Sequence, residues 1–570
     1  MATTRPSRSF EATSDYTVQL EDGSRVHRDH VAQNERLRPR LASPRSGVWC
    51  VLGNGLSNQS FIEGPDGIIA IDSGESQEEM AASLAQLREV TSRPIVAVLY
   101  THFHYVSGTK AIMEEAGTLL PIYGHKKIDG NLARASTEIA PTYSRGLIEQ
   151  FAIALPGEGP DHAQNVGLGL YWKRPDLGKS TPGYLPPDVT FDEDTTLQVA
   201  GLTIEVTMAP SDADDSVTYF FPELGVAVHN LVWPLLFNIF AIRGEEYRDP
   251  NVLIRGIDHV LSLGAEHLVA THGPTMSGGD EIIARVTRYR DSLAFIWDQT
   301  VRHTNLGATT NDLAHTVQLP ALYSEDFLTT ELYGVVEHHA RQIRSGLFGF
   351  FDGDPANLFP VKTALRSARL IAGFGGEDVV RQQVATAYGA GDVRWGIELA
   401  SWLSTRDDAT SGDHQLLAQG LRLIAERTTA ANIRSWCLTR ALVLEGTLDS
   451  GWMKVHQLRP KVIIASPLER SVHLLRVLVD PSRAEGIDVH VAFAFDGETT
   501  GLHVRNAIAA PTSGEGASVT LRGAKSTWAS LVCGKASLSA LLGSGDLQVE
   551  GSTDAVVQAL SVFDLPALRS

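Results

Sequence analysis

Two histidines separated by one residue, His102 and His104, are the side chains of this sequence best suited to metal chemistry. They follow the apolar run PIVAVLY, which is typical of a buried strand, and a glycine turn then opens a helix at about Ser107. Two imidazoles at one strand end can point into the same cleft, as a divalent ion requires. The alternative is a pair of polar loop histidines without a ligand role.

The segments around this pair predict the elements that would hold it. From about Gly47 to Ile283, β-rich runs alternate with helical periods, which indicates an α/β layered domain. From about residue 285 to 450 the periods are helical throughout, and from about 452 strands and helices mix again. A chain of 570 residues is too long for one hydrophobic core, and three domains fit its length.

Composition narrows the possible partners and the compartment. The net charge of −19 argues against a nucleic-acid partner, which would need a basic face. No apolar run approaches the ~20 residues of a membrane span, and the N-terminus lacks the apolar region of a secretory signal. The three cysteines are scattered, so a metal site would use His, Asp and Glu. We therefore expect a cytoplasmic protein without a membrane partner.

Several blocks of the sequence resemble one known family. The order FIEGPDGIIAIDSG and then LYTHFHYVSGT is similar to the first two signature blocks of the metallo-β-lactamase superfamily, with Asp72 at a position that supports the metal. The alkylsulfatase branch is indicated by YSRGLIEQFAIALP, VTYFFPELGVAVHN, FAIRGEEYRDP, ELYGVVEHHARQIRSGLFGFFDGDPANLFP and LQVEGSTDAVVQAL. The resemblance runs from about Asn54 to the C-terminus.

The resemblance implies a fold and domain boundaries. A flexible N-terminus (1–25) would precede an αββα sandwich of the metallo-β-lactamase type (26–284). A helical dimerisation domain (285–450) and a small sterol-carrier-like α+β domain (452–570) would follow, the latter either gathering an alkyl chain or serving a purely structural role. We accordingly expect a homodimer.

The family's metal motif is incomplete in this chain. The pattern His-x-His-x-Asp-His reads here as His102 and His104 followed by Val106 and Ser107. Valine has no donor atom and serine is a poor ligand, so a second ion would lack two of its usual bonds. We expect one divalent ion per subunit, with zinc the first choice and iron the second.

Alignment with the family places further candidate ligands. Asp212 stands where the family has a metal-binding Glu, with Asp214 and Asp215 as competitors. Asn230 replaces the bridging Glu, and the neighbouring His229 is a possible extra ligand. His272, in LVATHGPTMSGG, matches the last family histidine.

The resemblance also suggests substrate-contacting residues. Arg243 occupies the place of an Arg near the sulfate, and a guanidinium can pair with a tetrahedral oxyanion. An ordinary salt bridge with nearby Glu245, Glu246 or Asp249 is the alternative, and Arg248 is a second candidate. His338 resembles a histidine near the cleft, although a core or surface role is equally open, and Tyr143 is a candidate contact residue.

Three functions remain possible at this point. The first is a metal-dependent hydrolase that cleaves the sulfate ester of an apolar alkyl substrate. The second is a mononuclear iron enzyme that acts on an unsulfated apolar molecule through oxygen activation or elimination. The third is a dimeric ligand-binding scaffold without catalysis.

Overall fold

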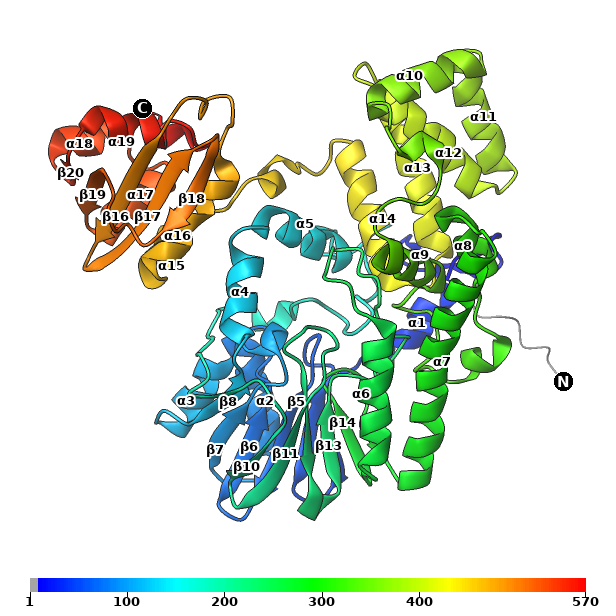
Figure 1. The fold of residues 1–570 in the computed structure, drawn as a ribbon. Helices are drawn as coiled ribbons and strands as arrows, with labels where there is room; N and C mark the ends of the chain where they lie inside the picture. The colour runs from blue at the N-terminus through cyan, green and yellow to red at the C-terminus, as the bar shows by residue number, and fades with distance from the viewer. Residues whose placement is uncertain (1–8, 570) are drawn as a thin grey trace. The chain divides into compact units, whose positions relative to one another are not determined.

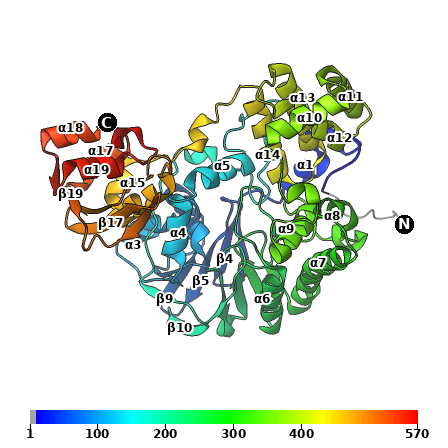
Figure 2. The same ribbon diagram turned by 45° about the horizontal axis from the view of Figure 1, so that its top comes forward.

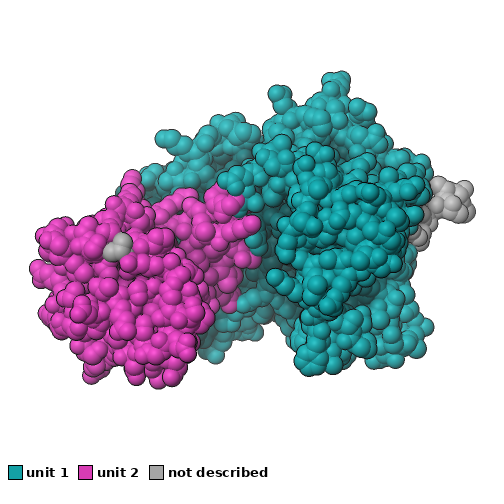
Figure 3. Space-filling view, turned by 90° about the horizontal axis from the view of Figure 1, so that it is seen from above, with its two compact units in different colours: residues 1–129, 145–450 teal, residues 130–144, 451–570 magenta. Residues whose placement is uncertain are grey.

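The computed structural model describes residues 9–569, which form two compact units (Figures 1 and 2). The first comprises residues 1–129 and 145–450, and the second comprises residues 130–144 and 451–570 (Figure 3). The longer segment of the second unit begins at residue 451, next to the expected start of the C-terminal domain at 452, and residues 130–144 belong to the unit as well. Residues 1–8 of the expected flexible N-terminus lie outside the described part of the chain.

Two stacked β-sheets form the centre of the first unit. The seven-stranded sheet has the order β3 (Arg40–Arg45), β4 (Val48–Leu52), β5 (Gln59–Gly64), β6 (Gly67–Ile71), β7 (Ile95–Leu99), β8 (Ile122–His125) and β9 (Val189–Phe191). The six-stranded sheet has the order β10 (Thr195–Val199), β11 (Leu202–Met208), β12 (Val217–Phe221), β13 (Val226–His229), β14 (His267–Ala270) and β15 (Met276–Ser277).

The two sheets pack face to face through apolar residues that alternate along the strands. Ile69 and Leu99 from the first sheet meet Val206 and Val228 from the second in one buried cluster. Helices α2 (Gln77–Arg88) and α3 (Thr109–Ala116) cover the outer face of the first sheet, and α6 (Pro250–Ser262) and α7 (Gly279–Asn305) cover that of the second (Figure 1). The expected αββα sandwich is confirmed.

Helices build the rest of the first unit. After α7 come α8 (Thr310–Thr316), α9 (Val336–Phe348), α10 (Thr363–Phe374), α11 (Glu377–Gly389), α12 (Val393–Ser404), α13 (Ser411–Arg427) and α14 (Ala431–Leu444). The expected boundary at 284/285 falls inside α7. Ile257 of α6 and Ile282 and Leu293 of α7 share one buried core, so this boundary does not separate two cores.

From Ser9 onward, the N-terminal segment pairs with the C-terminal end of α13 and the residue that follows it. The Glu11 amide donates to the Arg427 carbonyl at 3.1 Å, and Phe10 forms a β-bridge with Thr428. Strands β1 (Thr17–Gln19) and β2 (Arg25–His27) and helix α1 (Arg28–Asn34) follow. The partners of this segment lie about 400 residues away, so local sequence patterns carry no sign of them.

The second unit is a small α+β domain. Its five-stranded sheet has the order β18 (Ile508–Thr512), β17 (Glu498–Arg505), β16 (Val489–Phe495), β19 (Val519–Gly523) and β20 (Leu547–Glu550). Helices α15 (Pro460–Ala465), α16 (Leu468–His473), α17 (Lys525–Val532), α18 (Leu538–Ser544) and α19 (Thr553–Leu560) belong to it, and Phe493, Trp528 and Phe563 centre its core. Among all described residues, no helix is both long and apolar enough to cross a bilayer.

Candidate metal centre

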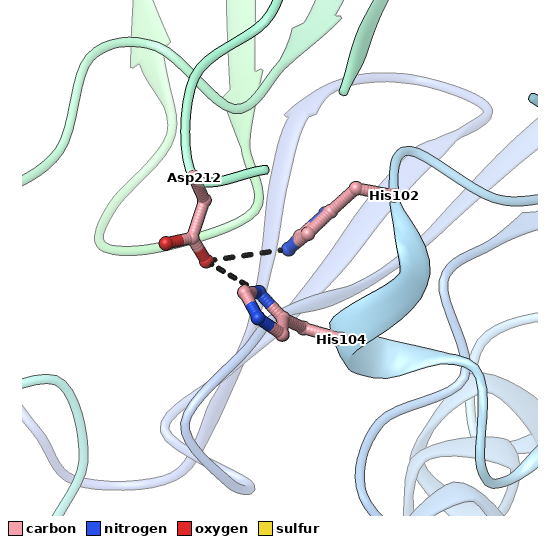
Figure 4. A group of neighbouring side chains, drawn as sticks. All are labelled: His102, His104 and Asp212. Carbon is pink, nitrogen blue, oxygen red and sulfur yellow. Dashed lines mark hydrogen bonds and ion pairs between the residues drawn. The ribbon is translucent and has the colours of Figure 1, made fainter. Parts of the chain in front are cut away.

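Three side chains from two sheets meet where the strands end. His102 follows β7, His104 lies in the short 3-10 helix η1 (Phe103–Tyr105), and Asp212 lies in the loop between β11 and β12. His102 Nε2 and His104 Nδ1 lie 3.4 and 2.8 Å from the same Asp212 oxygen, Oδ2 (Figure 4). Within the described residues, this is the one group of three His, Cys, Asp or Glu side chains whose ligand atoms all lie within 4.8 Å of one another.

The protonation states of these side chains favour the binding of a cation. Burial lowers the pKa of His102 to about 4, so its imidazole is neutral at pH 7. Burial opposes ionisation of Asp212, but Arg248 and His104 hold the pKa of that carboxyl well below its usual range. Neutral imidazole and ionised carboxylate are the forms that bind metals. The donor set and its convergence therefore fit one divalent ion.

Arg248 fixes Asp212 from the side opposite the histidines. Its guanidinium donates to Asp212 Oδ1, to the Asp212 carbonyl at 3.0 Å and to the Asn238 carbonyl at 2.6 Å. The Arg248 side chain is only 3% exposed and also lies over the Trp233 ring. The structure thus gives Arg248, the second candidate for anion binding, a role in holding a predicted ligand.

A hydrogen-bonded relay orients His102. Asp72 Oδ1 accepts from the Thr101 amide at 2.8 Å, and Asp72 Oδ2 accepts from Thr101 Oγ1 at 2.7 Å. Thr101 Oγ1 lies 2.9 Å from His102 Nδ1, so this hydroxyl can accept the imidazole proton and leave Nε2 free for a metal. Asp72 has φ 58°, a strained backbone conformation of the kind often kept at functional sites.

Thr101→Val is expected to weaken zinc affinity by about 10–100-fold, because the methyl group cannot accept the His102 proton. Zinc affinity is measured by competition with a chromophoric chelator. Thr207→Val, on β11, removes a hydroxyl away from the relay and should leave the affinity unchanged. Equal affinities for the two variants would contradict a role for the relay.

Arg243 forms the ion pair that was the alternative to substrate binding. Its Nη1 donates to Glu245 Oε2, and the same carboxylate oxygen lies 3.8 Å from His104 Nε2. Glu245, which the sequence analysis named as a possible partner of Arg243, thus lies beside the candidate metal ligand His104. The Arg243 amide donates to the Gln150 side chain at 3.2 Å, and that side chain donates to the Tyr333 hydroxyl at 2.8 Å.

The residues that replace the second-ion ligands offer little to a cation. Val106 is fully buried, and the Asn230 amide oxygen accepts from the Trp233 indole at 3.0 Å. His272 borders the three-residue group, with Nδ1 2.9 Å from the Leu56 carbonyl and Nε2 buried without a partner. The Tyr105 ring lies 5.2 Å from the rings of both His102 and His272. Val106, Asn230 and Tyr105 thus bring no anionic group to this half of the centre.

His229 is not brought to the three-residue group. It lies on the face of β13 that carries Ala227, and Ala227 packs in the core beneath α6 and α7. The next residue, Asn230, instead reaches within 3.3 Å of His102 Nδ1. Successive strand residues point to opposite faces, so neighbours in sequence separate here. His229 Nδ1 instead accepts weakly from the Leu231 and Val232 amides.

His338 and Tyr143 are the two remaining candidate contact residues. His338 packs edge-on against Phe240, and its Nε2 lies 3.7 Å from Glu337 Oε1. Burial lowers the pKa of His338 to about 4, so the ring is neutral at pH 7. The adjacent His339 is fully buried and interacts electrostatically with Arg248. Tyr143, in α5 (Ala140–Gln150), belongs to the second unit. Contacts of His338 and Tyr143 with substrate remain predictions.

Glu75 is an acidic residue of the centre that the sequence analysis missed. It follows Gly74, which pairs with Val106 in a β-bridge, so it lies beside the altered motif. Burial and the neighbouring Glu79 raise the pKa of Glu75 to about 8, although Lys173 and Arg243 oppose this shift. Glu75 also interacts electrostatically with Tyr105.

Glu75→Gln is expected to reduce the loss of stability on raising the pH. In the unfolded chain, Glu75 loses its proton near pH 4.5, whereas in the folded protein it keeps the proton to about pH 8. The free energy of unfolding therefore falls as the pH rises between these two values. Urea unfolding of metal-free protein at pH 5.5 and 8.5 measures the loss. The exposed Glu205→Gln should behave as wild type, and an equal loss in all three proteins would refute the assignment.

Comparison with known proteins agrees with this geometry. Residues 52–229 match the metallo-beta-lactamase superfamily, residues 309–447 the alkyl sulfatase dimerisation domain and residues 456–569 the alkyl sulfatase C-terminal domain. A linear primary-alkylsulfatase from a Pseudomonas species is 30% identical over 525 residues, which cover 88% of this chain and 98% of the relative. The chain belongs to the alkylsulfatase family. The resemblance seen in the sequence is confirmed.

More distant alkylsulfatases match over similar lengths. The alkyl/aryl-sulfatase BDS1 of Saccharomyces cerevisiae is 24% identical over 91% of this chain and 81% of its own. The stereoselective inverting sec-alkylsulfatase Pisa1 from a Pseudomonas species superposes with a TM-score of 0.83 at 22% identity, covering 98% of this chain and 91% of Pisa1. These matches favour a metal-dependent hydrolase over the iron enzyme and the non-catalytic scaffold.

Proposed function

We propose that this alkylsulfatase-family protein hydrolyses sulfate esters of apolar alkyl alcohols with one divalent ion, zinc in preference to iron. The observation that carries the proposal is the convergence of His102 Nε2, His104 Nδ1 and Asp212 Oδ2 in a chain whose relative at 30% identity is named a linear primary-alkylsulfatase. Water would add across the ester linkage to give an alcohol and hydrogen sulfate.

The ligand set supports one ion rather than two. His102, His104 and Asp212 supply three donors, while Val106 and Asn230 offer no anionic donor in the other half. A bound divalent ion would lower the pKa of a water molecule toward ~7 and so supply a nucleophile. Of the two further predicted ligands, His272 has the better support, because its Nε2 is buried without a partner and its ring interacts electrostatically with Asp212, His102 and His104. His229 has less support, since burial alone shifts its pKa.

Aromatic side chains support an apolar substrate. Tyr105, Trp233 and Tyr333 are buried beside the centre, and the Trp233 ring lies 4.4 Å from the His272 ring. Such a wall excludes water and suits an alkyl chain. Arg243, whose position the Gln150 side chain fixes, would donate to the sulfate oxygens.

Turnover of a medium-chain alkyl sulfate by zinc-loaded protein tests this proposal. Released sulfate is measured by ion chromatography before and after removal of the ion by a chelator. Release that stops on chelation and resumes with zinc is expected. No release from the loaded protein would contradict the proposed substrate class.

A homodimer is also part of the proposal, supported by the match to the dimerisation domain and by an apolar surface. Between α9 and α10, Phe350 and Phe359 are 87% and 89% exposed. Exposed apolar clusters of this kind mark interfaces. Phe350→Ser combined with Phe359→Ser should shift the mass in solution from dimer toward monomer, as light scattering would show, whereas a wild-type monomer would contradict the dimer.

A further inference from the structure

One carboxylate oxygen of the metal centre lies among three cationic or proton-bearing side chains. Glu245 Oε2 accepts from Arg243 Nη1, lies 3.8 Å from His104 Nε2 and lies 4.0 Å from Arg248 Nη2. Burial opposes the charge on Glu245, but Arg243, His104 and Arg248 together lower the pKa of that carboxyl. The three groups form an oxyanion cradle that the chain's own carboxylate fills.

This cradle has the chemistry that would bind the substrate's anionic group. Arg243 is the guanidinium assigned to the sulfate, and a guanidinium bonds carboxylate and sulfate oxygens in the same planar geometry. While Arg243 donates to the Glu245 carboxylate, the negative charge of Glu245 offsets the attraction of the guanidinium for an anionic substrate. A carboxylate and a sulfate at one guanidinium would also repel each other.

The Glu245 side chain is the more exposed partner of its pair with Arg243. It is 15% exposed, whereas the Arg243 side chain is 7% exposed. The preceding Gly244 has φ 84°, and no other group lies within 4 Å of the point where a Cβ would stand. Gln150 meanwhile anchors the Arg243 backbone. Movement of Glu245 into solvent would therefore free the cradle without moving Arg243.

We propose that Glu245 is a built-in competitor anion, which fills the oxyanion cradle of the resting protein and is displaced by the anionic group of the substrate. The inference rests on the proposed function, because it assigns the displaced position to the sulfate group. Glu245 accordingly sets anion affinity and selects against ligands too weakly charged to displace it.

Calorimetric titration of zinc-loaded protein with 1-octanesulfonate, which resists hydrolysis, tests the inference. Glu245→Gln keeps the shape but removes the charge, so the dissociation constant should fall by about tenfold or more, as expected for a freed charged hydrogen bond. Glu246→Gln removes the same charge from the exposed neighbouring residue and should bind as wild type. Glu245→Ala provides a second variant without the competing group.

Tighter binding by both Glu245 variants than by Glu246→Gln supports displacement. Equal or weaker binding by both, at equal zinc content, overturns it. The readout needs no turnover, so failure of the protein to hydrolyse alkyl sulfates would count against the proposed function, whereas unchanged octanesulfonate affinity would count against Glu245 as competitor.

Discussion

His104→Ala is expected to remove the bound ion and to reduce alkyl sulfate hydrolysis by at least about 1000-fold, since the nucleophile depends on the cation. His104 contributes one of three converging donors and also faces Glu245 through its other nitrogen. Its loss leaves two ligands, too few to hold a zinc ion firmly. Sulfate release and zinc content are measured on the same preparation.

A matched control separates this effect from general damage. His315 is an exposed histidine on α8, and His315→Ala should retain both the zinc and the activity. Full activity in His104→Ala would show that hydrolysis proceeds elsewhere in the protein.

Arg248→Met is expected to destabilise the metal-free protein by about 3–5 kcal/mol, because the variant leaves a buried carboxylate without its main counter-ion. The Asp212 and Arg248 side chains are 2% and 3% exposed. Methionine fills part of the space but donates no hydrogen bond to the Asp212 or Asn238 carbonyl. Urea unfolding, followed by tryptophan fluorescence, measures the change.

Arg255→Met, on the exposed face of α6, is the control for this substitution. A surface change of this kind should alter the unfolding free energy by no more than about 0.5 kcal/mol. Similar stability for the two variants would mean that the Asp212–Arg248 ion pair contributes little to the fold.

Much of the fold was accessible from sequence because its determinants are local. The continuous apolar runs GIIAI and PIVAVL predicted β6 and β7, and the helical periods predicted α7 onward. Strands β1 and β2 were not predicted, since they are too short to carry a pattern, and the bridge at Phe10 depends on the distant Thr428. The shared core of α6 and α7 likewise depends on tertiary packing.

Only part of the metal centre could likewise be predicted from the sequence. His102, His104 and Asp212 could be named from the motif and its family spacing, and the structure brings them together. The sequence could not show which of the neighbours Asn230 and His229 faces His102, because strand pairing decides this. Glu75 lies outside the quoted motifs, and Glu245 was named only as a partner for Arg243; the folded chain brings both to the centre.

Elemental analysis of the purified protein tests most directly whether this centre holds a single ion. About one zinc or iron atom per chain is expected in the wild type, and none in a variant carrying both His102→Ala and His104→Ala. Two ions per chain in the wild type, or an ion retained by the double variant, would contradict this expectation.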